Sequence, residues 1–426
     1  MKKNIGFFGF GNIGKGVYKI IQGNKESIYH KEKVDLKIKR ILVRDKNKNR
    51  DINFRSDILT EDYKDIILDD DISIVIEVMG GIEPARTMIL AALNNKKTVV
   101  TANKEVIAKH WDEFDNAARS NNVGLYFEAS VAGGIPIIKV IGESMQANEI
   151  TNILGIINGT TNYVLTKMSD DRIKFDDALE GAKRLGYSEP DPSADISGLD
   201  VMYKLSILSS MGFHSRVPLK NIYREGISHI TLDDIIYGKE LGYEIKLLAI
   251  SKKYENKIET RVHPTFIPAD HPLASVKDSF NAIFIKGSAV GELMLYGRGA
   301  GDMPTGSAVV SDVLSACKQS DNHRYQTFHE NVKLNDNIEF NDNWETEFFV
   351  RLTVKDKSGV LSKIAGVFAV YGVSIASLIQ KDKIGKCAPL IFVTHKTKEK
   401  SIEKAIVDIK LIDDVIKVEN VIRVER

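Results

Sequence analysis

The sequence of 426 residues lacks the features that mark membrane-spanning, disulfide-stabilised or nucleic-acid-binding proteins. No apolar stretch approaches the ~18 to 20 residues that cross a bilayer as a helix. The only two cysteines, Cys317 and Cys387, lie far apart along the chain, so we expect no disulfide framework, and a reducing compartment fits. The 59 lysines and arginines balance 58 aspartates and glutamates, so no net field would attract nucleic acid. These absences favour a cytoplasmic protein that binds neither nucleic acid nor membrane.

The composition and length predict several globular domains. Hydrophobic residues make up 43% of the chain and charged residues 27%, as in ordinary globular proteins. A chain of this length is too long for one core, which predicts two to four domains. Residues 321–346 are polar and poor in large apolar side chains, so we expect a linker there and a last domain at 347–426.

A glycine-rich turn follows the first apolar strand and precedes an amphipathic helix. It reads G-F-G-N-I-G and matches the pattern G-x-G-x-x-G. In this pattern the first glycine permits a tight turn, the second lets the backbone approach a pyrophosphate, and the third lets the helix pack on the strand. A purely structural turn is the alternative, because glycine turns are common. The candidate cofactor-binding residues are Gly9, Phe10, Gly11, Asn12, Ile13 and Gly14.

Strands and helices continue to alternate after this turn. Strands are expected at 36–44, 72–81, 98–104 and 123–131, with a helix between the second and third of these and another from about Lys104. Alternation of this kind predicts a parallel, doubly wound sheet of the Rossmann type. A dinucleotide would bind at the carboxyl ends of its strands.

The end of the second strand bears on which nicotinamide cofactor is bound. NAD sites usually place a carboxylate there, but Asp35 precedes the strand and is at its wrong end. Arg44 stands at the correct end, and a guanidinium suits the 2′-phosphate of NADP. Asp45 keeps NAD(H) possible, and a solvated basic loop is the structural alternative. NADP(H) is the expected cofactor.

A nearly uncharged helix is predicted at 198–213. Its only charges are Asp200 and Lys204, which share one face because they are four residues apart. On so apolar a helix both groups lose water, which is costly unless they meet a partner or a polar cleft. The pair is either a structural ion pair or a proton carrier whose pKa is tuned by burial and by its neighbour.

Six segments together resemble the homoserine dehydrogenase family, in order and at the family's spacings. The block at 186–204 is specific, whereas the glycine turn alone is not. The resemblance covers the whole chain and implies reversible NAD(P)H-dependent reduction of L-aspartate 4-semialdehyde to L-homoserine, a step of threonine, methionine and isoleucine biosynthesis. The segments are GFGNIG, TANKEVIA (101–108), EASVAGGIPII (128–138), NGTTNY (158–163), GYSEPDPSADISGLDVMYK (186–204) and GRGAGDMPTGSAVVSD (297–312).

The resemblance also implies roles for individual residues. Lys204 is the acid/base candidate, with Asp200 near the substrate and holding that lysine. Lys104, just past a strand end, could reach both nicotinamide and substrate and is the second candidate for the proton. Glu189 matches the family carboxylate that binds the ammonium group of the substrate. Asp195 is either a support for the 186–195 loop or an ordinary turn carboxylate.

Two further loops gain an interpretation from the resemblance. In EASVAGGIP, the backbone carbonyls of Glu128, Val131, Gly133 and Ile135 would hold Na⁺ or K⁺, which is plausible because hard cations take oxygen ligands. The glycine-rich segment at 297–306 opens a helix, and Gly301 is expected to approach the cofactor. A flexible connection is the alternative for that segment.

The last domain reads as strand, helix, two strands, helix and strand. This order predicts a ferredoxin-like sandwich and resembles an ACT domain. The turn DKSGVL (356–361) lies where ACT domains bind an amino acid, and free amides at a helix start suit a carboxylate. The resemblance implies L-threonine as effector and a homodimer or homotetramer; dimerisation without an effector is the alternative. The effector-site candidates are Asp356, Ser358, Gly359 and Val360.

The predicted organisation is α/β throughout. It comprises a Rossmann-type dinucleotide-binding domain at 1–130 completed by 297–320, an α+β substrate-binding and oligomerisation domain at 131–320, the linker, and the ACT domain. Two alternatives to the family's activity remain: another NAD(P)-dependent amino-acid semialdehyde oxidoreductase, and a non-catalytic amino-acid sensor.

Four histidines lack metal-ligand spacing and are expected in loops, namely His263, His271, His323 and His329.

Overall fold

The structure is a computed structural model of residues 1–426, and it describes all of them except 51–54, 319–331, 333–334, 336 and 383–384. The chain forms two compact units. The first comprises 1–158, 200–222 and 280–337, and the second comprises 159–199, 223–279 and 338–426. Among the described helices, none combines the length and the apolar character needed to cross a bilayer.

A six-stranded parallel sheet forms one part of the first unit, as the alternating pattern predicted. The strands are ordered β3-β2-β1-β4-β5-β6, and each neighbouring pair of strands is parallel. Their apolar residues and those of the flanking helices form a continuous core. The strands are β1 (Lys2–Phe8), β2 (Asp35–Leu42), β3 (Leu59–Thr60), β4 (Ile72–Glu77), β5 (Thr98–Thr101) and β6 (Leu125–Tyr126).

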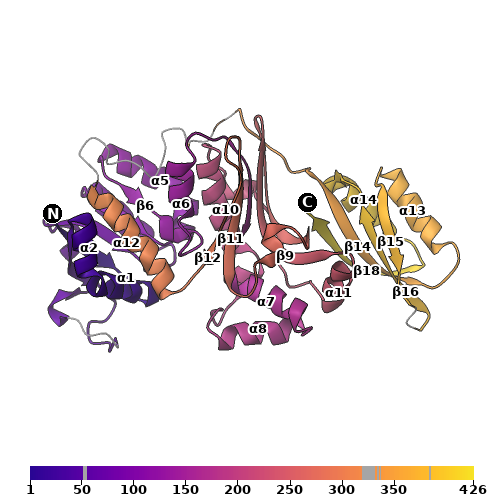
Figure 1. Ribbon diagram of the computed structural model, residues 1–426, viewed down its shortest axis with the longest axis horizontal. Coiled ribbons are helices and arrows are strands. Elements are labelled where there is room, and N and C mark those ends of the chain that lie inside the picture. The colour runs from indigo at the N-terminus through magenta and orange to yellow at the C-terminus, as the bar shows by residue number, and fades with distance from the viewer. Residues whose placement is uncertain (51–54, 319–331, 333–334, 336, 383–384) are drawn as a thin grey trace. The chain divides into compact units, whose positions relative to one another are not determined.

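Helices accompany this sheet, and one of them comes from a distant part of the chain. The helix that follows the glycine turn packs closely against α12 (Figure 1). A Cβ atom added at Gly16 would lie 2.1 Å from the carbonyl oxygen of Asp302, so only glycine permits this approach. The helices are α1 (Asn12–Gly23), α2 (Lys25–Glu32), α3 (Lys64–Ile67), α4 (Ala85–Asn94), α5 (Lys104–Ser120) and α12 (Asp302–Lys318).

The strand predicted at 123–131 is much shorter than expected. Only β6 joins the sheet, and a 3₁₀ turn at Glu128–Ser130 follows it. The backbone N–H of Glu128 donates to Asp312 of α12 instead of to a neighbouring strand. The apolar residues at 123–131 therefore indicate burial and not strand pairing. Periodicity alone does not distinguish a paired strand from another buried segment.

The rest of the first unit contains an antiparallel sheet and a buried helix. The sheet order is β12-β11-β7. The nearly uncharged segment forms α10, as predicted, and most of its residues are buried. These elements are α6 (Ile137–Lys139), a π-helical turn (Val140–Ser144), β7 (Ile150–Ile156), α10 (Leu199–Gly212), a 3₁₀ turn (Leu219–Asn221), β11 (Phe280–Gly287) and β12 (Gly291–Arg298).

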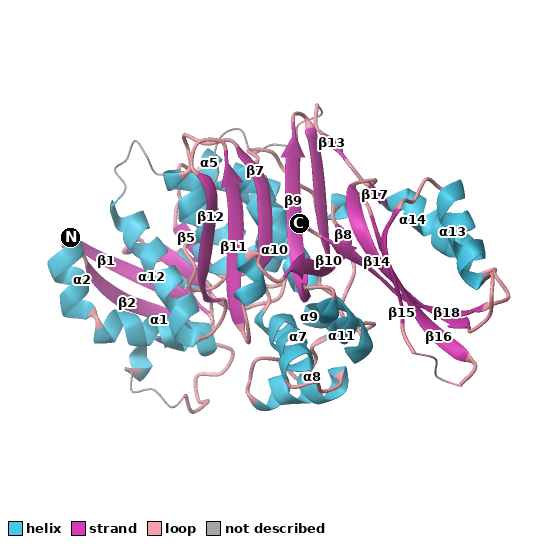
Figure 2. Ribbon diagram, turned by 45° about the vertical axis from the view of Figure 1, so that its right-hand side comes forward, coloured by secondary structure: helices cyan, strands magenta, loops and turns pink. Residues whose placement is uncertain are grey.

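The second unit contains a long antiparallel hairpin and a group of helices (Figure 2). A one-turn helix begins at Ser193, directly after Pro192. The elements are α7 (Gly159–Asp170), α8 (Phe175–Arg184), α9 (Ser193–Ile196), β8 (Tyr223–Arg224), α11 (Leu232–Glu240), β9 (Tyr243–Tyr254), β10 (Lys257–Pro268), a 3₁₀ turn (Pro272–Ser275) and β13 (Glu339–Phe340).

The C-terminal part of this unit is the predicted ferredoxin-like sandwich. Its four main strands are ordered β18-β14-β16-β15, and two helices cover one face of the sheet (Figure 2). Buried apolar residues of both layers form its core. The elements are β14 (Glu345–Lys355), α13 (Val360–Val370), β15 (Ile375–Gln380), β16 (Cys387–Thr394), β17 (Thr397–Lys398), α14 (Glu399–Ile409) and β18 (Val415–Val424).

The end of the sandwich continues into the hairpin of the same unit. Strand β18 pairs in parallel with β10 through Thr265–Arg423 and Phe266–Val424. Much of the predicted linker, including 321–331, lies outside the described residues. The three-domain division and its boundaries remain predictions.

The histidine prediction is wrong at one position. His263 lies within β10 and is fully buried, so it is not a loop residue. His271 does occupy the turn before Pro272, where its Nδ1 accepts from Leu273. His323 and His329 lie outside the described residues.

Candidate active site

The glycine turn packs tightly on one side and is open on the other. Gly9 has a φ of +95°, and a Cβ there would lie 2.8 Å from Cγ of Met79. A Cβ at Gly14 would lie 3.1 Å from the carbonyl oxygen of Gly9, so the turn packs tightly on this side. A Cβ at Gly11 would meet no atom within 4 Å, and α1 begins at the next residue. The turn is thus open at the helix start, where backbone N–H groups favour an anion.

The segment after β2 presents basic side chains at the carboxyl end of the strand. Arg44 is exposed there, whereas Asp35 is the first residue of β2, at the opposite end. Arg50 is buried and donates to the carbonyl oxygens of Asp45, at 2.5 Å, and Lys48, at 2.8 Å. Residues 44–49 are exposed, and the guanidinium of Arg50 ties the backbone of this segment together.

Lys104, Asp200 and Lys204 converge in the first unit. The Nζ atom of Lys204 donates to Oδ2 of Asp200 at 2.6 Å and to the carbonyl oxygen of Ile157 at 2.8 Å. The Nδ2 atom of Asn158 donates to the same Oδ2 at 2.9 Å. Nζ of Lys104 lies 3.2 Å from Oδ1. Two lysines from different helices thus share one carboxylate.

The position of Lys104 follows from the cap of its helix. Asn103 precedes α5, and its Oδ1 accepts from the backbone N–H of Val106 at 3.3 Å. Its Nδ2 donates to the carbonyl oxygen of Gly81, which follows β4, at 2.7 Å. The same side chain therefore caps the start of α5 and ties it to the segment that follows β4. Lys104 follows as the first residue of α5, and its ammonium group reaches Asp200 of α10.

The cluster contains one carboxylate and two lysines. Asp200 is only 6% exposed, and burial by itself would raise its pKa. The charges of Lys204 and Lys104 outweigh burial and hold the pKa of Asp200 well below its ordinary value. The carboxylate therefore stays ionised at neutral pH, and two ammonium groups face one anion. Such a site suits a substrate oxygen that acquires negative charge and takes up a proton.

The loop that contains Glu189 belongs to the second unit, where Glu189 is exposed. The hydroxyl of Thr160 donates to the carbonyl oxygen of Tyr187 at 2.6 Å and to Oδ2 of Asp195 at 3.0 Å. Asp195 thus supports the loop through the first turn of α7, which favours the support role over that of an ordinary turn carboxylate.

The segment expected to hold a monovalent cation has an unusual backbone. Ala132 and Gly133 both have positive φ values, 54° and 53°. A Cβ at Gly133 would lie 2.5 Å from the carbonyl oxygen of Gly299, so the backbones touch there. Val131 and Gly133 are buried, and within the described residues no donor reaches their carbonyl oxygens. Buried carbonyls without donors fit a hard cation.

Three family models match this chain: homoserine dehydrogenase at residues 136–314, the NAD-binding domain of homoserine dehydrogenase at 9–128, and the ACT domain at 348–410. The homoserine dehydrogenase of Bacillus subtilis is 39% identical, over 99% of this chain and 98% of its own. That of Helicobacter pylori is also 39% identical, over the full length of both. A solved homoserine dehydrogenase from Thiobacillus denitrificans superimposes with a TM-score of 0.93 at 39% identity, covering 100% of this chain and 98% of its own.

The chain belongs to the homoserine dehydrogenase family. The protein is therefore an oxidoreductase, and the expected family, activity and fold class are confirmed. The non-catalytic sensor and the unspecified semialdehyde oxidoreductase are set aside. A further solved relative, a hyperthermophilic archaeal homoserine dehydrogenase in complex with NADPH, is 31% identical over 74% of this chain and 98% of its own, with a TM-score of 0.61.

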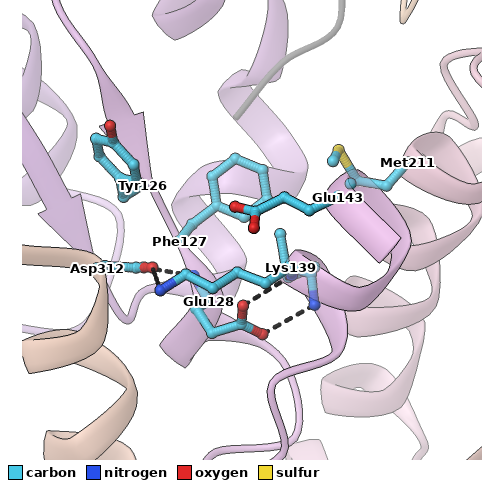
Figure 3. Close-up of a pocket in the computed structure, with 9 residues that line it drawn as sticks. Tyr126, Phe127, Glu128, Lys139, Glu143, Met211 and Asp312 are labelled. Carbon is cyan, nitrogen blue, oxygen red and sulfur yellow. Dashed lines mark hydrogen bonds and ion pairs between the residues drawn. The ribbon is translucent and has the colours of Figure 1, made fainter. Parts of the chain in front are cut away.

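In this homoserine dehydrogenase the side chain of Glu128 has a role that sequence reasoning missed. Its two carboxylate oxygens accept from the backbone N–H groups of Ile138 and Lys139, each at 2.8 Å (Figure 3). Nζ of Lys139 lies 3.2 Å from Oδ1 of Asp312, whose Oδ2 accepts from the backbone of Glu128 at 2.9 Å. Burial raises the pKa of Glu128 to about 7 and that of Asp312 to about 6. A lone acidic residue in an apolar segment was the available signal.

The ACT turn has an uncapped helix start. Gly359 is exposed, has a φ of +88° and precedes α13 without a side-chain cap. Asp356 and Ser358 are exposed beside it, whereas Val360 is buried in the core of the sandwich. Val360 could thus contribute its backbone but not its side chain to a ligand.

Proposed function

We propose that Lys204 is the proton donor in the reversible NAD(P)H-dependent reduction of L-aspartate 4-semialdehyde to L-homoserine. The cofactor, when bound, supplies the hydride that reaches the aldehyde carbon. The carbonyl oxygen then carries the electron pair of the broken π bond and takes one proton from Lys204, which regains a proton from water. The observation that carries this proposal is the convergence of Lys204 and Lys104 on the buried Asp200.

The hydrogen bonds of Lys204 support its role. An ammonium group has three N–H donors, and two of those of Lys204 are directed at Asp200 and at the carbonyl of Ile157. The third remains for a substrate oxygen. Asp200 orients the ammonium group, and Lys104 adds a second positive charge that stabilises the developing alkoxide. Glu189 would bind the ammonium group of the amino-acid substrate.

A substrate survey tests this function. The purified enzyme should reduce NADP⁺ or NAD⁺ when L-homoserine is added, followed spectrophotometrically. Matched alcohols that lack the α-amino group should support little turnover, because Glu189 would have no cation to bind. Equal rates with those alcohols would contradict the proposed substrate recognition.

NADP(H) is the proposed preferred cofactor, with NAD(H) as the alternative. The exposed Arg44 at the carboxyl end of β2 supports this choice, because a guanidinium pairs with a 2′-phosphate. The open side of Gly11 is where the pyrophosphate would approach. Gly301, which immediately precedes α12, is proposed to approach the cofactor as well.

A monovalent cation, Na⁺ or K⁺, is proposed on the carbonyl oxygens of Glu128, Val131, Gly133 and Ile135. Two of these already accept backbone hydrogen bonds: Glu128 from Val131 at 3.3 Å and Ile135 from Ile137 at 2.8 Å. A carbonyl oxygen has two lone pairs, so such a bond leaves one for a cation. The Glu128 carboxylate and Asp312 would hold the segment in place.

Regulation and assembly form the last part of the proposal. L-threonine is the proposed effector at Asp356, Ser358, Gly359 and Val360, where the uncapped start of α13 would receive its carboxylate. A homodimer or homotetramer is proposed on the basis of the ACT domain. A cytoplasmic location is proposed because the two cysteines are free and far apart in sequence.

A further inference from the structure

The end of β7 contributes two consecutive groups to the ion pair of Asp200 and Lys204. The carbonyl oxygen of Ile157 accepts from Lys204 at 2.8 Å, and the side-chain amide of Asn158 donates to Asp200 at 2.9 Å. Ile157 thus accepts a hydrogen bond from the ammonium group, and Asn158, the next residue, donates one to the carboxylate. Since both follow directly from β7, the strand sets their positions relative to α10.

The oxygens of Asp200 are divided among three donors in a specific way. Oδ2 accepts from both Lys204 and Asn158, while Oδ1 faces Lys104. A carboxylate held by lysines alone could rotate about its last bond, because ammonium groups follow an oxygen without a fixed direction. The planar amide of Asn158 adds a directional bond that fixes the plane of the carboxylate.

The burial and chemistry of Asn158 fit this task. The residue is 5% exposed, and its amide is neutral, so it adds a donor without changing the charge of the cluster. A carboxylate at this position would repel Asp200, and an aliphatic side chain would leave Oδ2 with one donor fewer in a buried place. Asparagine meets both demands.

We propose that Asn158 is a positioning residue of the reaction: its amide holds the Asp200 carboxylate so that Lys204 keeps one N–H directed at the substrate oxygen. The inference rests on the proposed function of Lys204. It makes Asn158 part of the proton-transfer geometry, although Asn158 need not touch the substrate. A purely structural role, in which Asn158 only terminates β7, is the competing explanation.

Two substitutions separate these explanations. Asn158→Leu removes the donor, and Asn158→Asp keeps the shape but replaces the donor by an acceptor. The loss of a hydrogen bond to a charged group predicts a fall in kcat of about 10- to 100-fold for Asn158→Leu. Affinity for NADPH, measured by fluorescence titration, should stay within about twofold, because the bond that is lost is the one to Asp200.

The pH profile is the readout that a structural role would not change. In homoserine oxidation, Lys204 must lose its proton before it can accept one from the alcohol. Without the Asn158 bond, Asp200 holds the proton of Lys204 more strongly, so the acidic limb of kcat/KM should move to higher pH. Asn158→Asp should move it further, since a second carboxylate adds negative charge.

A matched control exists in the second unit. Asn420 is 6% exposed, and its Nδ2 also donates to a buried carboxylate, that of Asp234, at 2.9 Å. Asn420→Leu should lower the melting temperature but leave the pH limb where it is. If both Asn158 variants fold and keep the wild-type kcat and pH limb, the inference is overturned. If Lys204→Met also retains activity, the proposed role of Lys204 as proton donor has failed, whereas an inactive Lys204→Met beside unaffected Asn158 variants refutes the inference alone.

Discussion

Lys104 and Asp200 meet at 3.2 Å although they belong to different helices. Lys104 is the first residue of α5, which follows a strand of the parallel sheet, and Asp200 lies in the first turn of the buried α10. The contact links the sheet edge where a dinucleotide would bind to the carboxylate that holds Lys204. A second contact joins the same helices, since the hydroxyl of Tyr203 donates to Glu105 at 3.2 Å. The relative position of two candidate acids is thus built into helix packing.

Lys204→Met should reduce kcat at least ~100-fold, the usual magnitude for loss of a general acid or base. Methionine has no proton to transfer, but its side chain fills much of the volume of lysine beside the buried Val201 and Leu208. Steady-state oxidation of homoserine measures the effect, and fluorescence titration with NADPH should show unchanged cofactor affinity.

Lys167→Met is the matched control for that variant. Lys167 also pairs with an aspartate four residues away, Asp171 at 3.4 Å, but its side chain is 30% exposed, and its ion-pair partners Asp171 and Asp278 are not proposed site residues. Its kcat should stay within about twofold of the wild type. A full rate in Lys204→Met would remove Lys204 from the chemistry and leave Lys104 as the proton donor.

Local patterns predicted much of this site, because periodicity and caps are local properties. The start of α5 at Lys104, the burial of α10 and the pairing of Asp200 with Lys204 all follow from neighbouring residues. The contact of Lys104 with Asp200 and the bond from Asn158 were not predicted, because they depend on tertiary packing. The carboxylate of Glu128 was missed for the same reason: its partners are backbone N–H groups, which no sequence pattern marks.

Arg44→Gln should weaken NADP⁺ much more than NAD⁺. Removing a guanidinium from a 2′-phosphate loses a charge-assisted hydrogen bond, which predicts a rise of about 10-fold or more in KM for NADP⁺. KM for NAD⁺ should change little, since NAD⁺ carries a hydroxyl there. Arg86→Gln is the control, because Arg86 already pairs with Glu113 and Glu83. An equal effect of Arg44→Gln on both cofactors would contradict the NADP preference.

Gly133→Ala should abolish any dependence of activity on Na⁺ or K⁺. The added Cβ would lie 2.5 Å from the carbonyl oxygen of Gly299 at a φ of +53°, so the segment must shift. The measurement compares melting temperature and rate in NaCl, KCl and choline chloride. Gly23→Ala is the control, because a Cβ there meets no atom within 4 Å. A wild-type response to cations in Gly133→Ala would argue against the carbonyl site.

The second unit should lose stability on acidification, in two steps. Burial and the charges of Arg423 and Arg261 hold the pKa of His263 well below 6.5. Burial would raise the pKa of Glu225, but a hydrogen bond from His229 and the charge of Arg423 lower it to about 2. Both groups have a lower pKa in the folded protein, so the unfolded chain binds more protons as the pH falls. Stability should therefore decline below about pH 6.5 through His263 and again between about 4.5 and 2 through Glu225.

Substitutions assign the two steps. His263→Asn should flatten the dependence of the urea midpoint on pH between about 6.5 and 5, because asparagine does not titrate there. Glu225→Gln should leave that region unchanged and remove up to ~3 kcal/mol of acid-dependent loss at lower pH. Both variants need a comparison at pH 7.5. Glu225→Gln loses the ion pair with Arg423 there, but Arg423 keeps Glu399 as a partner. A wild-type pH dependence in both variants would show that acid sensitivity arises elsewhere, and not from this buried cluster.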